Sequence, residues 1–285
     1  MKMPPFDYAC PSTLSEAVGL LAAHDGDAKV LAGGQSLVPV LAFRLAAPKL
    51  LVDLRKLPDL RNIRITQDGV TLGAMVRWCD IEGDVRLRTA HPLLIAAIAH
   101  VAHYQIRNRG TVGGSIAHAD PAAEMPGIAV TCEAEILVVG QAGSRTIEAA
   151  DFFQGALTTA LKTDEIIVEI RLPAWPARRR WGFQEFARRR GDFALAAAAV
   201  FYDTDGGKAT SAHVGVVGVA DRPLRLASVE AILNGSTIDE ATIAKADAAS
   251  CAAVNPDGDI HASAAYRKSL AGTMVERALK MAAAG

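Results

Sequence analysis

Two glycine pairs, each followed by a hydroxyl side chain, are the residues of this chain best suited to hold a ligand. They lie in residues 32–37 (AGGQSL) and residues 111–115 (TVGGS). Glycine accepts positive φ values and lets a ligand approach the backbone closely, and successive N–H groups of such a turn form a concavity that binds anions. A single glycine pair is most often an ordinary turn. Two pairs with similar flanks predict two turns that hold one diphosphate between them.

The familiar phosphate-binding motifs are absent from the sequence. Neither G-x-G-x-x-G nor G-x-x-x-x-G-K-[ST] occurs, which argues against a Rossmann dinucleotide site and against a P-loop. Neither glycine pair contains a lysine, so neutral backbone N–H groups would make most of the contacts. This favours a permanently bound dinucleotide over a phosphoryl group in transfer.

Polar side chains crowd the segment that follows the second pair. Asp120 and Glu124 could accept hydrogen bonds from the hydroxyls of a ribityl or ribose chain, because an ionised acceptor makes the stronger bond. Asp120 could equally cap a helix that starts at Pro121, and His118 could serve the turn itself. We expect no metal site here, since no histidine or carboxylate partner lies at a suitable spacing.

An aromatic side chain in the C-terminal half could meet a flat ligand. In the segment RGDF, Asp192 and Phe193 lead into an expected strand over residues 194–203. Phe193 could stack against a planar ring or gate it. A place in the hydrophobic core is the commoner use of such a residue.

The elements that position these residues are predicted from capping signals and periodicity. A T-x-x-E capping box starts a helix over residues 13–24, and strands at 29–32 and 50–54 give the chain a β-α-β-like opening. Alternating apolar residues predict further strands, and apolar residues at helical spacing predict further helices. The expected strands are 63–66, 70–72, 135–139, 145–147, 165–170, 181–187, 194–203 and 213–220. The expected helices are 92–103, 125–131, 226–234, 239–252 and 264–283.

These elements predict an α+β protein in three parts. Residues 1–57 and 58–176 would be the two parts of a ligand-binding domain, each with one glycine pair. Residues 177–285 would form an antiparallel sheet covered by helices. The second limit is placed near Pro173, Pro176 and the arginine run that follows them.

The balance of charges argues against partners that need a strong field. The sequence has 30 Lys and Arg against 31 Asp and Glu, a formal net charge of −1, so we expect no binding to nucleic acid or to an anionic membrane. The arginine runs at 178–180 and 188–190 are more typical of a solvated edge or a partner-facing patch. Four scattered cysteines, no signal-peptide pattern and no apolar run of about 20 residues predict a cytoplasmic protein without a membrane span.

The two glycine segments, with FDY at 6–8 and DL at 53–54, closely resemble the medium, flavin-binding subunit of molybdenum hydroxylases. The carbon monoxide dehydrogenase medium subunit is the nearest type, and the flavin domain of xanthine dehydrogenase is related. The likeness covers essentially the whole chain. It implies a two-part FAD-binding domain of the vanillyl-alcohol-oxidase (PCMH) type, followed by a small C-terminal domain of sheet and helices.

The resemblance also implies which residues hold FAD. The first glycine segment would bind the diphosphate, the second would complete the site, and Glu124 would bind cofactor hydroxyls. Three positions depart from the family pattern: Ser115 stands for asparagine, Glu124 for aspartate, and Phe193 for a tyrosine whose hydroxyl is lost. No catalytic residue and no metal ligand is expected in this chain. With the residues singled out above, the expected cofactor-binding set is Ala32, Gly33, Gly34, Gln35, Ser36, Leu37, Val101, Tyr104, Thr111, Gly113, Gly114, Ser115, His118, Asp120, Glu124, Leu161, Ile167, Asp192 and Phe193. In this set, Val101 and Tyr104 would lie on the helix that precedes the second pair.

The activity that the resemblance implies is electron transfer within a complex. A large subunit with the molybdenum cofactor would hydroxylate the substrate, and a small subunit with two [2Fe–2S] clusters would pass the electrons on. FAD in this chain would deliver them to an external acceptor. We therefore expect an oxidoreductase built as a heterotrimer, and as a dimer of such heterotrimers.

Two other hypotheses stay open from the sequence. Ser115 lies in a stretch that approximates a nucleophile elbow, with Asp259 and His261 downstream in the order of a hydrolase triad. Ala117 stands where the elbow has its final glycine. The chain could also be a non-catalytic assembly subunit that carries no flavin. A visible absorption spectrum separates these alternatives.

Overall fold

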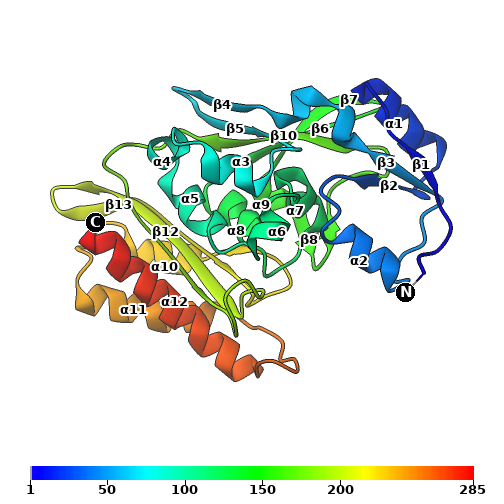
Figure 1. Ribbon diagram of the computed structural model, residues 1–285. Coiled ribbons are helices and arrows are strands. Elements are labelled where there is room, and N and C mark those ends of the chain that lie inside the picture. Colours follow the sequence, from blue (N-terminus) through cyan, green and yellow to red (C-terminus); the bar gives the residue numbers. More distant parts are fainter. Residues whose placement is uncertain (1) are drawn as a thin grey trace.

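Four layers follow one another across most of the molecule (Figure 1). They are a five-stranded sheet, a group of short helices, a four-stranded sheet and a layer formed by the last three helices of the chain. A separate three-stranded sheet stands beside the N-terminus. The computed structural model describes residues 2–285.

The N-terminal part is a small parallel α/β unit. Its strands pair in the order β1-β3-β2, with every pairing parallel. This confirms the β-α-β opening, and Thr13 caps the first helix by accepting the N–H of Glu16, as the capping box predicts. The elements are β1 (Asp7–Ala9), α1 (Leu14–Ala23), β2 (Ala28–Leu31), α2 (Leu37–Ala42) and β3 (Leu50–Asp53), followed by the 3₁₀ turns η1 (Leu54–Lys56) and η2 (Pro58–Arg61).

The middle part is an antiparallel sheet with helices on one face. The strand order is β4-β5-β10-β6-β7, so β10 enters the middle of the sheet from far along the chain. The strands are β4 (Ile63–Thr66), β5 (Gly69–Gly73), β6 (Glu135–Gly140), β7 (Gly143–Glu148) and β10 (Ile166–Pro173), with a hairpin of β8 (Phe153–Gly155) and β9 (Thr158–Thr159). The helices are α3 (Trp78–Gly83), α4 (Leu87–Ala90), α5 (Pro92–Ile98), α6 (Tyr104–Arg107), α7 (Val112–His118), α8 (Glu124–Thr131) and α9 (Ala149–Phe152).

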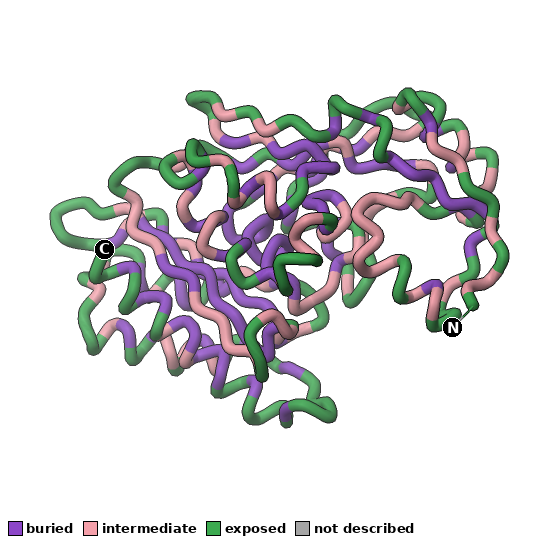
Figure 2. The backbone as a smooth tube through the Cα atoms, in the orientation of Figure 1, coloured by how far each residue is buried: buried purple, intermediate pink, exposed green. Residues whose placement is uncertain are grey.

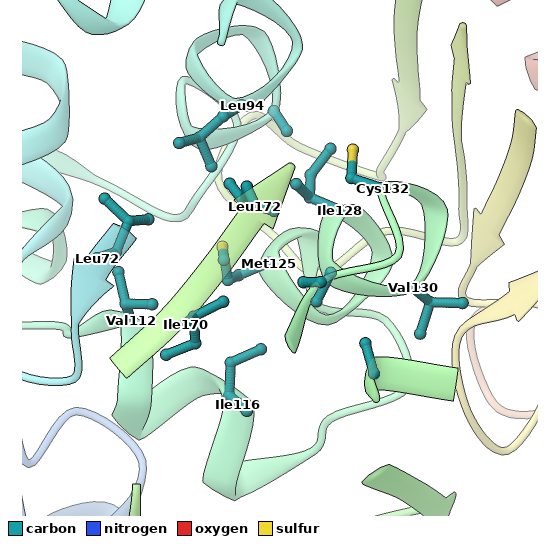
Figure 3. Packing of buried hydrophobic residues seen from close by; sticks show 14 of the residues in the cluster. Leu72, Leu94, Val112, Ile116, Met125, Ile128, Val130, Cys132, Ile170 and Leu172 are labelled. Atoms are coloured by element: carbon teal, nitrogen blue, oxygen red, sulfur yellow. The ribbon is translucent and has the colours of Figure 1, made fainter. Parts of the chain in front are cut away.

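The main hydrophobic core lies between this sheet and its helices (Figure 3). Leu72 and Ile170 from the sheet pack with Ile116 of α7 and with Met125 and Ile128 of α8. All five side chains are fully buried. The core therefore fixes α7, which carries the second glycine pair, against the sheet.

The C-terminal part has a sheet that is buried on both faces. Along β12, Ala197, Ala199 and Phe201 join the core of the central helices, whereas Ala198 and Val200 join the core of the C-terminal helices. Successive side chains of a strand point to opposite faces, which explains why residues 196–202 of β12 are all apolar and buried (Figure 2). The elements are β11 (Arg180–Phe186), β12 (Ala196–Asp205), β13 (Lys208–Val217), β14 (Leu224–Arg225), α10 (Ala227–Leu233), α11 (Glu240–Ala253) and α12 (Ala264–Ala284).

The helix expected over residues 92–103 is shorter than predicted. It ends at Ile98, and a turn with positive φ at Ala102 separates it from α6. Arg107 donates to the carbonyl oxygens of Val101 and Ala102, so these acceptors are satisfied without a continuing helix.

The strand expected over residues 213–220 is also wrong in its limits. The strand β13 begins at Lys208, because Gly206 and Gly207 with positive φ form a tight turn that lets the pairing with β12 start at once. It ends at Val217, where Gly218 turns the chain with a φ of 77°. None of the helices in residues 2–285 is both long and apolar enough to span a bilayer.

Close packing of α12 on β11 gives a first prediction. A Cβ on Gly182 would collide with the carbonyl oxygen of Ala278, so Gly182→Ala should lower the free energy of unfolding by about 1–3 kcal/mol. Gly19→Ala is the matched control, because nothing lies within 4 Å of its new methyl group in α1. The control should be neutral or slightly stabilising. Urea unfolding measures the free energy of unfolding of both variants. A Gly182→Ala chain as stable as the Gly19→Ala control would contradict this packing.

Candidate functional site

The first glycine pair forms a cradle of backbone N–H groups between β2 and α2. Gly34 has a φ of 73°, and the side-chain Nε2 of Gln35 donates to the carbonyl of Gly33 at 3.2 Å. Among residues 2–285, no acceptor faces the N–H groups of residues 33–37. Successive free N–H groups around a left-handed residue form a site for an anion. This turn therefore agrees with the sequence prediction and fits a diphosphate.

The second glycine pair is not a turn, and this prediction is wrong. Thr111 is the N-cap of α7, and both glycines lie in the first turn of that helix. Val112 and Gly113 donate to the carbonyls of Val76 and Ala74, and Gly114 donates to the Thr111 hydroxyl at 3.2 Å. The first N–H groups of α7 therefore already have hydrogen-bond acceptors within the protein. Its glycines are required for packing, since a Cβ on Gly113 would lie 2.5 Å from that of Ala74.

The two glycine segments nevertheless lie against each other. A Cβ on Gly33 would collide with the carbonyl oxygen of Arg109, and one on Gly114 would lie 3.6 Å from the Cβ of Ala32. The fold therefore brings together the two parts of the sequence that were expected to share a ligand. The hydroxyl of Ser115, half-buried on α7, lies one residue beyond this contact.

The buried carboxylate of Asp53 stabilises the end of β3, the strand that pairs with β2 next to the cradle. Asp53 ends β3 opposite Leu31, and its Oδ2 accepts hydrogen bonds from the Tyr8 hydroxyl at 2.8 Å and from Arg55 Nε at 2.6 Å. Burial alone would raise the pKa of Asp53, but the hydrogen bonds from Arg55 and Tyr8 lower it. The carboxylate in turn raises the pKa of Tyr8 to about 12. The network fixes β1 and β3 beside the strand that leads into the cradle.

Glu124 is the first residue of α8 and is buried against the C-terminal sheet. Only 8% of it is exposed, and it lines a cavity of about 10 Å³ together with Phe183 and Val217. Burial first, and then the negative charges of Glu185 and Asp120, raise its pKa to about 8. At neutral pH its carboxyl is therefore mostly protonated and able to donate a hydrogen bond. Asp120 accepts the N–H of Ala122 at 2.9 Å and so closes the turn that precedes α8.

Phe193 and Tyr104 are exposed aromatic side chains on neighbouring segments: Phe193 lies in a loop, and Tyr104 begins the separate short helix α6 rather than lying on the helix expected before it. They are 63% and 67% exposed. A Cβ on Gly191 would collide with the ring of His103, so the loop of Phe193 is pressed onto the turn before α6. The expected strand start is wrong: Asp192 and Phe193 lie in this loop, and β12 begins only at Ala196.

The remaining predicted residues have varied surroundings. Val101 lies in the turn after α5 rather than on the helix and is 9% exposed. Leu161 is half-buried and Ile167 is buried in the main core. His118 ends α7 half-buried, next to Ala119, whose carbonyl accepts the N–H of Leu157 from the β8–β9 hairpin.

Sequence reasoning missed the two residues that directly precede the second glycine segment. Arg109 and Gly110 provide the backbone surface against which Gly33 packs, and Gly110 itself leaves room for the Trp78 side chain. The glycine just before the second pair was an available signal, because glycine permits close approach of another backbone.

The hydrolase hypothesis lacks its geometry. Ser115 lies inside a regular helix, whereas a nucleophile elbow needs a strained turn between a strand and a helix. Asp259 does not orient a histidine ring: Oδ1 accepts the N–H groups of His261 and Ala262, and Oδ2 pairs with Arg267. His261 is exposed. The structure offers no support for a triad.

Comparisons with known proteins match the whole chain. The family described as FAD binding domain in molybdopterin dehydrogenase matches residues 4–175, and the CO dehydrogenase flavoprotein C-terminal domain matches residues 181–282. The nicotine 6-hydroxylase medium subunit of Paenarthrobacter nicotinovorans is 39% identical to this chain. The alignment covers 100% of this chain and 99% of that subunit.

Solved structures agree with this likeness. Carbon monoxide dehydrogenase from Hydrogenophaga pseudoflava superposes with a TM-score of 0.97 at 38% identity, covering 100% of this chain and 99% of that one. Quinoline 2-oxidoreductase from Pseudomonas putida 86 gives 0.95 at 40% identity, with the same coverage. The predicted fold, a PCMH-type FAD-binding domain followed by a C-terminal domain, is confirmed. The chain belongs to the family of FAD-binding medium subunits of molybdenum-containing hydroxylases and is an oxidoreductase subunit.

Proposed function

We propose that the cradle of residues 33–37 holds the diphosphate of FAD. The observation that carries this proposal is the run of free N–H groups around Gly34, set directly against the second glycine segment. Neutral donors of this kind suit a cofactor that stays bound. In this proposal, Ala32 and Gln35 complete the turn, and hydroxyls come from Thr111, the N-cap of α7, and from Ser115 on α7.

The rest of the predicted set would surround the other parts of the cofactor. Glu124, protonated at neutral pH, can donate to a cofactor hydroxyl as well as accept from one. Phe193 on its loop and Tyr104 at the start of α6 would meet the flat ring system by stacking or edge contacts. The further members are Leu37, Val101, Gly113, His118, Asp120, Leu161, Ile167 and Asp192. We also propose the domain limits at 57/58 and 176/177, because the first follows β3 and η1 and the second falls between β10 and β11.

We further propose that this chain is the flavin-carrying subunit of a heterotrimer with a molybdenum subunit and a [2Fe–2S] subunit, paired as a dimer of heterotrimers. Bound FAD would supply a centre that accepts electrons from the iron–sulfur subunit and releases them to an external acceptor. The relatives are named for different substrates, among them nicotine, carbon monoxide and quinoline. Their full-length likeness to this chain supports a substrate choice made in the molybdenum subunit. A cytoplasmic location belongs to the same proposal.

The experiment that tests the function is a visible absorption spectrum of the purified chain, with its FAD content after extraction. We expect flavin absorption bands and about one FAD per chain, either as purified or after reconstitution. Expression with the neighbouring genes should recover the chain together with molybdenum and iron–sulfur subunits. A colourless chain that resists reconstitution would instead favour an assembly subunit without flavin.

A further inference from the structure

The loop of Phe193 joins β11 to β12 and is closed at its base by two kinds of contact. Leu195 donates its N–H to the carbonyl of Phe186 at 2.8 Å. The ring of Phe186 meets that of Tyr266 edge-on, with ring centres 6.3 Å apart. Tyr266 belongs to the first turn of α12, so this helix reaches the base of the loop from the far side of the sheet.

Arg267, the next residue of α12, binds the other end of the same loop. It is only 9% exposed, and its Nη1 donates to the carbonyls of Leu195 at 2.9 Å and of Gly218 at 2.8 Å. Its Nη2 donates to Asp259 Oδ2 at 2.7 Å. Hydrogen bonds from the N–H groups of Ala262 and His261 and the nearby Arg267 lower the pKa of Asp259 to about 2. The buried guanidinium therefore has an ionised partner at neutral pH.

Through Gly218, the same side chain reaches the second loop of the candidate site. The N–H of Gly218 donates to the carbonyl of Pro121 at 2.9 Å, next to Asp120. The φ of Gly218 is 77°, and a Cβ there would lie 2.8 Å from the Ala194 carbonyl. The backbones of the two loops thus meet at this glycine, and one guanidinium holds both.

We propose that Arg267 is a positioning residue that holds the Phe193 loop and the Asp120–Pro121 turn in place at the flavin. The inference rests on the proposed function, which places both segments beside the cofactor. Arg267 itself touches neither glycine segment; it acts through the carbonyls of Leu195 and Gly218. A lysine cannot replace it fully, because only the planar guanidinium presents several donors in a fixed fork.

Limited tryptic cleavage of the full-length chain tests the anchor without depending on activity. The loop carries three exposed arginines at 188–190, which report its opening directly. We expect Arg267→Met to be cleaved there at least about tenfold faster than wild type, since losing charge-assisted hydrogen bonds shifts local opening by that order. Arg267→Lys should lie in between. Arg277→Met is the matched control, because Arg277 is an exposed arginine of the same helix.

The flavin supplies a second measurement that a purely structural role would not change. With FAD bound, iodide should quench the flavin fluorescence of Arg267→Met more strongly than that of wild type and of Arg277→Met, with Arg267→Lys restoring part of the protection. Wild-type cleavage rates and wild-type quenching in a folded Arg267→Met would overturn the inference. If that variant does not fold, Asp259→Asn decides, with faster cleavage supporting the anchor and an unchanged rate refuting it. A wild-type chain that takes up no FAD would count against the proposed function alone.

Discussion

Gly34→Val is expected to give a folded chain that retains no FAD. Gly34 has a φ of 73°, a conformation that β-branched residues adopt only at a cost of roughly 1–3 kcal/mol. Its added Cβ would also lie 3.2 Å from the Val38 side chain on α2. The backbone must then rotate or α2 must move, and either change points the N–H groups of the cradle away from a common centre. A diphosphate would lose several hydrogen bonds at once.

The FAD content of the purified variant is the measurement, with circular dichroism as the check on folding. Gly235→Val is the matched control: Gly235 has a similar φ of 81° but nothing within 4 Å of a new Cβ. It carries the same backbone strain at a turn in the C-terminal part, so it should keep its flavin. Stoichiometric FAD in a folded Gly34→Val chain would remove this turn from the binding site.

The first glycine segment shows how much of the site could be predicted from sequence. A glycine pair after a short strand, with no lysine beside it, indicates a turn of free N–H groups, and the structure has one. This inference succeeds because it is local: the conformation of Gly34 and the missing partners both depend on a few neighbouring residues. The parallel pairing of β2 with β3 follows from equally local signals.

The second glycine segment shows why the rest could not be predicted. Gly113 is needed because Ala74, far away in sequence, packs against it, and a Cβ on Gly114 would lie 2.8 Å from the Thr111 hydroxyl oxygen. A pattern of glycines does not tell close packing at a helix start from a tight turn, since both require a missing Cβ. Gly110 indicated a close backbone approach at the segment of Arg109, but nothing local indicated that Gly33 would be its partner. In the same way, no local signal indicated that α12 would hold the Phe193 loop.

The second large effect concerns the stability of the chain without cofactor as a function of pH. Burial and the charges of Glu185 and Asp120 raise the pKa of Glu124 from 4.5 to about 8. Between these values the folded chain keeps a proton that the unfolded chain has lost, so stability must fall as the pH rises. The loss from this one group is at most about 1.4 kcal/mol for each pH unit. It is absent below pH 4.5 and complete above pH 8.

Glu124→Gln should therefore be more stable than wild type at pH 8 and close to it at pH 5, measured by urea unfolding at several pH values. Glutamine keeps the volume and the hydrogen-bonding groups of a protonated carboxyl, so the difference between the two curves isolates the buried charge. Glu148→Gln changes an exposed glutamate, so its free energy of unfolding should vary with pH in parallel with that of wild type.

Removing only the neighbouring charge separates the two causes of the shift. Glu185, whose side chain is 4% exposed, faces Glu124 from β11. Glu185→Gln relieves the repulsion but leaves Glu124 buried, and burial is the larger cause, so this variant should recover a smaller part of the stability lost at pH 8. Curves for Glu124→Gln and wild type that stay parallel from pH 5 to 8 would show that Glu124 is charged in the folded chain. Its carboxyl could then accept hydrogen bonds from cofactor hydroxyls but could not donate one.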